Sequence, residues 1–398
     1  MYNVLIAHNF YRSATPSGES IVFDAERKLL CDRGVEVHEF TRHSDAIDRG
    51  GWRGGVSAAI GVPWNQASVQ AIRNELRKIQ PDIVHVHNTF PLLSPAIFWA
   101  IGHRAARVLT LHNYRLFCPA AIPMRDGKIC TECLDRHSVI SSLKYGCYRN
   151  SRLATIPLAG SVALHRMIRT WKTQVDAFIC LTEFQKKLMV EAGLPAAKVH
   201  VKPNFYPGTP KVLPWEERSS YVVFAGRLTA EKGVVSLLRA WQILGKQAPE
   251  LRLVGEGDLK AELERMAVGL PIRFLGQVSA EEAQVQIANA RLLVLPSEWF
   301  EGFPMVVREA FAFGTPAAVS DIGPLSTIVE QNKSGVLFEP GNPDSLAKTL
   351  YDAWSTPNLL QRLGRGARLE FEQKYTEEAN YTALMDIYRA ALEASHNG

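Results

Sequence analysis

The stretch that decides the fold covers residues 298–320, EWFEGFPMVVREAFAFGTPAAVS. It follows the apolar run RLLVLP, residues 291–296, which is typical of a buried parallel strand. Residues 301–303 form a short loop, and Pro304 stands at the expected first position of a helix. The helix continues over residues 305–313 before a Gly-Thr-Pro tripeptide ends it. The stretch therefore predicts a strand–loop–helix unit of an α/β sheet.

This loop has the features of an anion site, because a glycine turn brings backbone N–H groups to a helix N-terminus. Two carboxylates, Glu301 and Glu309, flank the turn. Since carboxylates repel phosphate, we expect them to bind uncharged groups such as sugar hydroxyls. Taken alone, the stretch leaves open an equal alternative, in which both acids are incidental.

The bulk composition indicates an ordinary globular protein of two domains. The chain has 398 residues, with 46% apolar and 21% charged residues. No apolar run reaches the length of a membrane span and no signal pattern opens the sequence, so we expect a cytoplasmic protein.

Charge is distributed unevenly along the chain. Residues 1–204 carry 26 Lys+Arg against 16 Asp+Glu, whereas the remainder carries 19 against 24. A basic first half favours an anionic partner, such as nucleic acid, an anionic membrane surface or a phosphorylated acceptor. A generically basic surface is the alternative.

Short apolar segments alternate with amphipathic ones throughout, which is typical of parallel α/β sheets. Expected strands cover residues 4–8, 35–40, 82–87, 107–112, 177–181 and 199–201, then 221–226, 251–254, 272–275, 292–295, 316–319 and 335–338. Further helices are expected at residues 19–32, 69–79, 183–191 and 375–394. The proline-rich segment at 203–214 breaks the pattern and is the best linker candidate.

The sequence thus predicts two Rossmann-like, doubly wound parallel-sheet domains. We expect a first domain at residues 1–204, with a Cys-rich insertion at 117–150, and a second domain at 205–374. Residues 375–398 would follow as a helix. Ligands in such sheets bind outside the carboxyl ends of the strands.

Several strand-end loops carry chemistry suited to a nucleotide. In GRLTAEKG, residues 226–233, Arg227 offers a planar fork and Lys232 a point charge for a diphosphate. Two further glycine loops, LVGEGD (253–258) and FLGQV (274–278), would let the backbone approach a flat ring. The alternatives are solvated basic side chains and ordinary strand–helix turns.

In their order and spacing, these three loops and EGFPMVVRE (301–309) resemble glycosyltransferase family 4. The likeness covers most of residues 221–344, and PDIVHVHN (81–88) and LTLHN (109–113) are also typical of the family. Its members are retaining enzymes of the GT-B fold that use nucleotide-diphosphate sugars. The resemblance therefore implies an acceptor-side domain (1–204) and a donor-binding domain (205–374) that face each other across a cleft. It also implies that the helix at 375–398 returns to the first domain.

The resemblance also implies roles for side chains of this chain. Arg227 and Lys232 would hold the donor diphosphate and stabilise the leaving group. Glu309 would bind ribose hydroxyls, and Glu301 a hydroxyl of the donor sugar. His112, from the other domain, would bind the donor sugar, although a lone strand-end histidine is more often structural.

The remaining donor contacts implied by the resemblance come largely from backbone and loop residues, namely Gly18, Gly226, Gly255, Gly276, Gln277, Gly302, Phe303, Pro304, Met305 and Val306. Gly276 and Gln277 would lie against the nucleobase. In the first loop, Ser17 replaces the first glycine of the family's Gly-Gly pair, while Gly18 matches the second. Arg308 is a second departure, which we expect on the outer face of its helix.

The mechanism that the resemblance implies is front-face attack by the acceptor hydroxyl, with the departing phosphate as base. Catalysis would need no cofactor, no catalytic metal and no nucleophile, so Glu301 receives no covalent role. The donor would be of UDP or GDP type. The acceptor would be a glycan or a lipid-diphosphate-linked sugar in surface polysaccharide or glycolipid biosynthesis, with no nucleic-acid partner. A nucleotide-sugar epimerase, or a catalytically silent scaffold or regulator on the same fold, is the alternative.

Four of the six cysteines lie in one segment with the spacing C-x11-C-x2-C-x13-C, namely Cys118, Cys130, Cys133 and Cys147. In a cytoplasmic protein such clustering favours a metal site over disulfides. A structural zinc ion would stabilise the irregular insertion, while reduced cysteines without metal are an equal alternative. We expect Cys31 and Cys180 in the core.

A last pattern concerns a membrane. Leu164, Met167, Ile168 and Trp171 form one apolar stripe, with basic residues between them. Such a helix is suited to an anionic membrane, here the inner face of the cell membrane, but is more often a core-facing helix with a solvated side.

Overall fold

The structure, a computed structural model, describes residues 2–11 and 17–396. Pro16, which belongs to the departing first loop, lies outside the described residues, as do residues 397–398 at the end of the expected last helix. The chain divides into two compact units. Unit 1 comprises Met1–Pro123, Cys130–Pro203 and Asn380–Gly398, and unit 2 comprises Met124–Ile129 and Asn204–Ala379.

Unit 1 is built on a six-stranded sheet in the order β2-β1-β3-β4-β7-β8, in which every neighbouring pair is parallel. Its strands are β1 (Asn3–Phe10), β2 (Glu36–His43), β3 (Ile83–Asn88), β4 (Ala106–Leu111), β7 (Ala177–Cys180) and β8 (Val199–Val201). β3, β4 and β7 are buried along their whole length, as expected for apolar strands covered on both faces.

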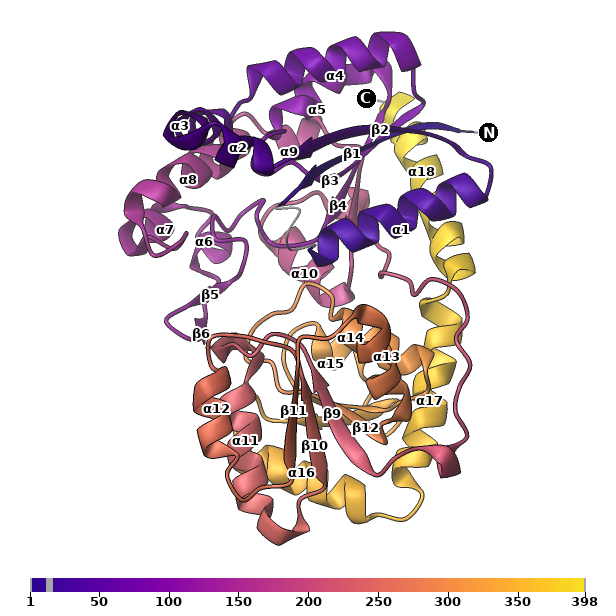
Figure 1. Cartoon of the computed structure of the whole chain (residues 1–398). Helices are drawn as coiled ribbons and strands as arrows, with labels where there is room; N and C mark the ends of the chain where they lie inside the picture. The colour runs from indigo at the N-terminus through magenta and orange to yellow at the C-terminus, as the bar shows by residue number, and fades with distance from the viewer. Residues whose placement is uncertain (1, 12–16, 397–398) are drawn as a thin grey trace. The chain divides into compact units, whose positions relative to one another are not determined.

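The helices of unit 1 connect these strands and cover the sheet (Figure 1). They are α1 (Gly18–Asp32), α2 (Asp45–Arg49), α3 (Gly51–Gly61), α4 (Gln66–Ile79), α5 (Ala96–Ile101), η1 (Gly102–Arg104), α6 (Glu132–Asp135), α7 (Ile140–Tyr145), α8 (Arg152–Met167), α9 (Thr170–Thr173), α10 (Glu183–Glu191) and η2 (Ala196–Lys198). Polar side chains begin several of them: the side chain of Ser17 caps α1 and that of Asn65 caps α4.

The last helix, α18 (Glu377–His396), belongs to both units by residue. Its first three residues are part of unit 2, and the rest is part of unit 1. Leu384, Ile387, Tyr388 and Ala391 of α18 share a core cluster with side chains of β1, β3, β4 and β7. Figure 1 shows this helix, in yellow, beside the strands of unit 1.

Unit 2 repeats the plan with the strand order β11-β10-β9-β12-β13-β14, again with parallel pairs. Its strands are β9 (Tyr221–Ala225), β10 (Glu250–Val254), β11 (Ile272–Gly276), β12 (Leu292–Leu295), β13 (Ala317–Ser320) and β14 (Gly335–Phe338). Its helices are η3 (Trp215–Glu217), η4 (Ala230–Lys232), α11 (Val234–Leu244), η5 (Gly245–Gln247), α12 (Lys260–Met266), α13 (Ala280–Asn289), α14 (Met305–Ala312), α15 (Leu325–Ile328), α16 (Pro343–Ser355) and α17 (Leu359–Lys374). Met124–Arg125 (β5) and Lys128–Ile129 (β6) form an antiparallel hairpin.

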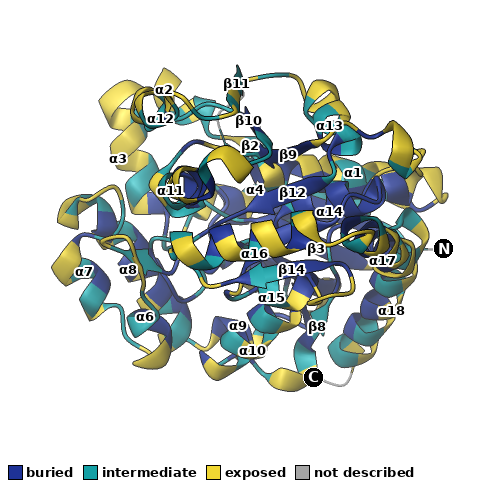
Figure 2. Cartoon of the chain, turned by 90° about the horizontal axis from the view of Figure 1, so that it is seen from below, coloured by how far each residue is buried: buried dark blue, intermediate teal, exposed yellow. Residues whose placement is uncertain are grey.

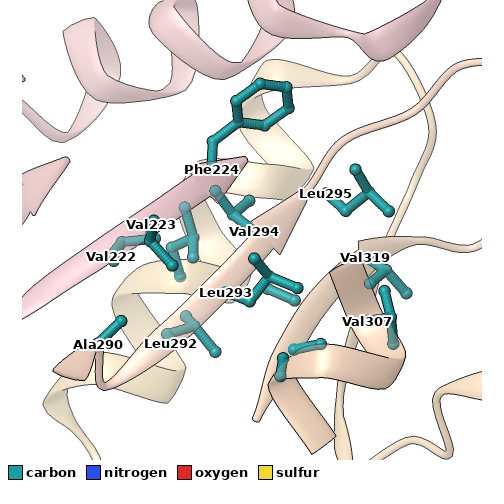
Figure 3. Close-up of a cluster of buried hydrophobic side chains, with 14 of the residues drawn as sticks. Val222, Val223, Phe224, Ala290, Leu292, Leu293, Val294, Leu295, Val307 and Val319 are labelled. Carbon is teal, nitrogen blue, oxygen red and sulfur yellow. The ribbon is translucent and has the colours of Figure 1, made fainter. Parts of the chain in front are cut away.

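The core of unit 2 is a continuous apolar cluster around its central strands. Figure 3 shows Val222, Val223 and Phe224 of β9 beside Leu292–Leu295 of β12, and these side chains are at most 1% exposed. Burial of each such side chain contributes about 1.5–3 kcal/mol. Outer helices are amphipathic: Figure 2 shows α16 with an exposed face opposite the face that carries Leu346 and Leu350.

The strand orders confirm the expected doubly wound class and place a crevice in each unit. In unit 2 the order reverses between β9 and β12, so the loops that follow these two strands meet at the carboxyl edge. In unit 1 the reversal lies between β1 and β3. Among the described residues, no helix has the length and apolar character needed to cross a membrane.

Two expectations about single residues are wrong. Arg308 is buried rather than on the outer face of α14, because residues 205 and 206 cover it: its guanidinium donates to the carbonyl of Phe205 and lies over the ring of Tyr206. Cys31 is exposed, since it falls on the outer side of α1, whereas Cys180 is buried in β7. Trp171 is buried against Phe98, which agrees with the core-facing alternative for the apolar stripe.

Candidate functional site

The loops that follow β9 and β12 converge on an ion pair. Lys232 Nζ lies 2.7 Å from Glu301 Oε1, and Glu301 is 5% exposed. The same carboxylate oxygen accepts hydrogen bonds from Ser297 Oγ at 2.6 Å and from Trp299 Nε1 at 3.2 Å. Three donors on one oxygen fix the orientation of Glu301 and hold the ammonium of Lys232 at this edge of the sheet.

A glycine makes the approach of the two loops possible. Gly233 has φ +67°, and a Cβ there would lie 1.8 Å from the carbonyl oxygen of Pro296. The loops are also joined by their backbones, since Glu298 N donates to Glu231 O at 2.9 Å. Any other residue at position 233 would push the cationic loop away from Glu301.

Arg227 lies in the same loop as Lys232 but in a different setting. Its side chain is 65% exposed, and Nη2 is 3.1 Å from Glu231 Oε1. An exposed i,i+4 pair is weak, so the guanidinium is available to an anionic ligand. Arg227 therefore offers an exposed cation in the loop that also carries Lys232, whose ammonium is held by Glu301.

The other glycine loops lie against this one. Gly255 N donates to Gly276 O at 2.8 Å, and Gly226 N donates to Val254 O at 2.9 Å. A Cβ on Gly255 would lie 2.0 Å from Gly226 O, and Gly255 has φ +135°. Gly276 ends β11 with φ +70°, and Gln277 beside it is exposed. The three loops thus form one backbone-lined edge.

Helix α14 begins at this edge with its first amide groups uncapped by any side chain. Pro304 occupies the N-cap position and offers no N–H, so Met305 and Val306 carry the leading donors. Gly302 and Phe303 precede them, and the Phe303 ring packs edge-on against Tyr375 at 5.9 Å between centroids. The helix terminus is therefore suited to an anion.

Glu309 lies one turn further along α14. Burial raises the pKa of its carboxyl, and Arg308, whose Nη2 is 3.4 Å away, opposes this rise. The side chain keeps 21% of its surface exposed. A carboxyl group has two oxygens that can accept hydrogen bonds, so Glu309 can bind a pair of neighbouring hydroxyls.

In unit 1, His112 directly follows β4. Its Nε2 lies 3.0 Å from Nδ1 of His87, and the two rings stack with centroids 5.3 Å apart. Burial and the neighbouring His87 hold the pKa of His112 well below its ordinary value, so the imidazole is neutral. Both histidines line a pocket of unit 1 together with Asn113 and Arg115.

Gly18 is the first residue of α1, and a Cβ there would meet no atom within 4 Å. The neighbouring Glu19 is half-buried, and its Oε1 accepts a hydrogen bond from Asn113 at 2.7 Å. Burial raises the pKa of Glu19, which Asn113 and Arg115 oppose. The start of α1 is thus tied to the loop that carries His112.

The four clustered cysteines are all free. Cys133 lies close enough to Cys118, Cys130 and Cys147 to interact electrostatically with each of them. Among the described residues, however, the sole group of three or more ligand atoms within 4.8 Å is Glu26, His85 and His87. A structural zinc ion at these cysteines therefore stays a prediction.

Residues that the sequence did not single out complete these sites. Ser297 and Trp299 fix Glu301, and Glu26 lies beside His87 in the core of unit 1. The sequence does contain a signal for the polar cluster around His87: His85 and His87 lie two residues apart on a strand and therefore on the same face. Nothing local marks Glu26, which lies on α1.

Family models match two consecutive parts of the chain. The model described as Glycosyltransferase Family 4 matches residues 18–207, and the model described as Glycosyl transferases group 1 matches residues 208–370. An uncharacterized glycosyltransferase of Methanocaldococcus jannaschii is 30% identical over 198 residues, which are 46% of this chain and 50% of that protein. D-inositol 3-phosphate glycosyltransferase of Streptomyces avermitilis is 34% identical over 197 residues, 44% of this chain and 42% of that protein. The chain spans about half the length of these curated relatives.

Solved structures share the fold over nearly the whole chain. Sucrose-phosphate synthase from Thermosynechococcus elongatus has a TM-score of 0.67 at 19% identity, and the alignment covers 98% of this chain and 100% of the synthase chain. Anabaena HepE, in complex with UDP and glucose, has a TM-score of 0.63 at 18% identity and covers 97% and 99%. These likenesses confirm the expected GT-B fold class.

Proposed function

Because the chain belongs to the glycosyltransferases, with a family 4 domain followed by a group 1 domain, we propose that it transfers a sugar from a nucleotide-diphosphate sugar to a glycan or lipid-linked acceptor. The observation that carries this proposal is the 2.7 Å contact between Lys232 and Glu301. It joins a cationic loop to an acidic loop at the point where the strand order of unit 2 reverses.

In this proposal the donor diphosphate takes the place beside Lys232, Arg227 and the first amides of α14. Glu301, held by Ser297 and Trp299, accepts from a hydroxyl of the transferred sugar. Glu309 binds the ribose hydroxyls. The glycine edge at Gly255 and Gly276 lets the nucleobase lie close to the backbone, with Gln277 beside it.

The proposed chemistry is a transfer with retention of configuration. The acceptor oxygen forms a bond to the anomeric carbon, the bond between that carbon and the diphosphate oxygen breaks, and the acceptor proton passes to the departing phosphate. The residues of this chain position the reactants and stabilise the growing negative charge. The role that the sequence resemblance gives to His112, a contact with the donor sugar, is part of the proposal.

Nucleotide binding tests the site directly. Calorimetry with UDP and with GDP should show that Lys232→Ala and Arg227→Ala lower the affinity for the nucleotide by roughly 10- to 100-fold, since each removes a charge-assisted contact. Lys246→Ala is the matched control, because Lys246 is exposed at the opposite edge of the same sheet. Unchanged affinity in both loop variants would contradict the proposed site.

The donor nucleotide is part of the same test. HepE was crystallised with UDP, and we propose a UDP- or GDP-type donor for this chain. Product analysis with an acceptor separates the alternatives. A free epimerised sugar nucleotide would identify an epimerase, and nucleotide binding without any turnover would identify a silent scaffold.

We also propose that unit 1 docks on an anionic membrane surface, which suits a lipid-diphosphate-linked acceptor at the cytoplasmic face. The exposed side of α8 carries Leu153, Ile156 and Met167, and that of α3 carries Trp52 and Ile60. Residues of both helices line one pocket, and the two helices lie close together in Figure 1.

Exposed basic side chains accompany these apolar ones, namely Arg49, Arg53, Lys144, Arg149 and Arg152. Each basic residue near an anionic surface contributes about 1 kcal/mol, and the apolar side chains enter the interface between headgroups and acyl chains. This surface differs from the stripe expected from the sequence, of which Met167 is the exposed member.

Vesicle co-sedimentation tests the docking surface. Vesicles of phosphatidylcholine with phosphatidylglycerol should bind the protein better than phosphatidylcholine alone, and Trp52→Ser with Ile60→Ser should reduce binding at least tenfold. Val268→Ser in unit 2 is the control, since Val268 is 82% exposed and Trp52 76%. Equal binding by both variants, or self-association of the wild type without vesicle binding, would contradict a membrane role.

A further inference from the structure

A series of neighbouring polar side chains extends from Lys202 to His112 in unit 1. Lys202 Nζ lies 2.5 Å from Glu26 Oε2. The other oxygen, Glu26 Oε1, lies 3.2 Å from Nε2 of His87, a contact between charge and imidazole in which neither atom completes a hydrogen bond. Nδ1 of His87 then lies 3.0 Å from Nε2 of His112. The four groups come from α1, β3 and the segments after β4 and β8, so the fold assembles them.

Three of these four side chains, those of Lys202, Glu26 and His87, are shut off from water, and His112 is half-buried. Lys202 is 2% and Glu26 1% exposed, and the side chain of His87 is fully buried. A second carboxylate–imidazole contact, 3.3 Å from Glu26 Oε1 to Nδ1 of His85, branches from the same oxygen. His85 has partners of its own, Tyr388 Oη at 2.9 Å and Thr110 Oγ1 at 2.8 Å.

Two more groups face this series from packed elements. Asn380 of α18 places Oδ1 3.3 Å from Lys202 Nζ, and it donates from Nδ2 to the carbonyl of Pro203. His8 of β1 stands edge-on to His87, with ring centroids 6.4 Å apart, and Nε2 of His8 is 3.3 Å from Ser20 Oγ. Burial, His87 and His43 lower the pKa of His8 to about 3, so His8 is neutral.

The protonation states along the series follow from burial and charge. Burial alone would raise the pKa of Glu26, but Lys202 and the histidines hold it well below its ordinary value. An ionised carboxylate only accepts hydrogen bonds. His112 is neutral, as shown above, so it carries one ring proton and its tautomer depends on its neighbour.

We propose that Glu26 and His87 are positioning residues that fix the tautomer of His112. The carboxylate of Glu26 favours a proton on Nε2 of His87, which leaves Nδ1 of His87 as an acceptor. His112 then donates from Nε2, and its Nδ1 becomes an acceptor for a ligand hydroxyl. Among the described residues, Nδ1 of His112 has no hydrogen-bond partner. The inference rests on the proposed function in one respect, the contact of His112 with the donor sugar.

The same trio of Glu26, His85 and His87 has ligand atoms spaced closely enough to hold a metal ion. The ammonium of Lys202, at 2.5 Å, already neutralises Glu26, and it would repel a second cation. The positioning role therefore fits the charges of this cluster better than a metal site does.

Nitrogen NMR of the full chain with labelled histidine tests the tautomer without any substrate. The signals of His112 are those that disappear in His112→Gln. We expect neutral His112 with its proton on Nε2 in the wild type. The double variant Glu26→Gln/Lys202→Met, which removes the buried charges together, should populate the Nδ1–H form. Tyr388→Phe is the control, because Tyr388 contacts His85 and none of the groups between Lys202 and His112. This variant should leave the tautomer of His112 unchanged.

Kinetics supply the second readout. The double variant should lose on the order of 10²-fold in kcat/KM for sugar transfer, as misplaced groups do, whereas Tyr388→Phe should retain activity within about threefold. The inference would be overturned if His112 of the wild type carries its proton on Nδ1, or if the tautomer of His112 is the same in the double variant. It would also be overturned if the wild type binds a stoichiometric metal ion that is lost when Glu26 is replaced. Absence of transfer by a wild type with the expected tautomer would instead count against the proposed function.

Discussion

Replacing Lys202 by methionine should destabilise unit 1 strongly, because it leaves Glu26 as an uncompensated buried charge. The ammonium and the carboxylate are 2.5 Å apart and at most 2% exposed, so solvent does not screen the loss. Removal of one partner of such a pair costs about 3–5 kcal/mol. Methionine keeps most of the side-chain volume, so a cavity contributes little to this loss.

Urea unfolding followed by circular dichroism measures the effect as a change in the free energy of unfolding. The double variant Glu26→Gln/Lys202→Met should recover most of the loss, because neutral groups replace both charges. In the wild type the pKa of Glu26 is depressed, so its contribution is present above the ordinary glutamate value and is lost as pH falls. In Lys202→Met, burial without the cation raises that pKa, so the deficit should grow from about pH 4 to neutrality.

A loss below about 1 kcal/mol in Lys202→Met at neutral pH would refute the assignment of a buried, charged pair. So would a double variant that is no more stable than the single one. A deficit that is constant between pH 4 and 7 would show that Glu26 does not carry the charge assigned to it.

Three further outcomes are expected. Gly233→Ala should lower the stability by more than about 4 kcal/mol or prevent folding, because the added Cβ would meet Pro296 O. Gly269→Ala, where φ is +81° and the space is open, should lower the stability by only about 1–2 kcal/mol. Equal thermal denaturation of the two variants would contradict the steric argument. Glu309→Gln should stabilise the ligand-free protein increasingly as pH rises above about 4.3, because the raised pKa of Glu309 in the folded state makes its ionisation unfavourable. The same variant should weaken nucleotide binding. Melting temperatures at pH 5 and 8 check that the stabilisation grows with pH. Tyr388→Phe should cost about 1–2 kcal/mol in urea unfolding, because it removes the 2.9 Å partner of His85 Nδ1, and an unchanged stability would show that this contact is not maintained.

The candidate site illustrates how far local patterns reach. The cationic loop of Arg227 and Lys232 and the acidic loop of Glu301 each carry a visible motif, and parallel-sheet topology places both at a strand end. That Lys232 and Glu301 touch depends on β9 and β12 being neighbours, although 69 residues separate the two side chains. Strand order is a property of the whole sheet, so no window of sequence contains it.

Errors came from positions where burial depends on a distant segment. Arg308 falls where a helical wheel alone suggests an outer face, yet the chain at residues 205 and 206 returns to cover it. Cys31 has an apolar side chain typical of cores, but the turn of α1 directs it outward. Side-chain type indicates a preference for burial, and only packing decides whether a covering element exists.

The sequence by itself determined the alternation of strands and helices, the fold class and the residues of the donor-type loops, because backbone periodicity, glycine turns and helix starts depend on neighbours a few positions apart. The tertiary structure decided which of these residues pair and which other groups support them. Glu26 meets Lys202 across 176 residues, and His85 meets Tyr388 across 303. Such contacts form because the sheet and α18 fold around one core, and their protonation states follow from the exclusion of water that the folded core imposes.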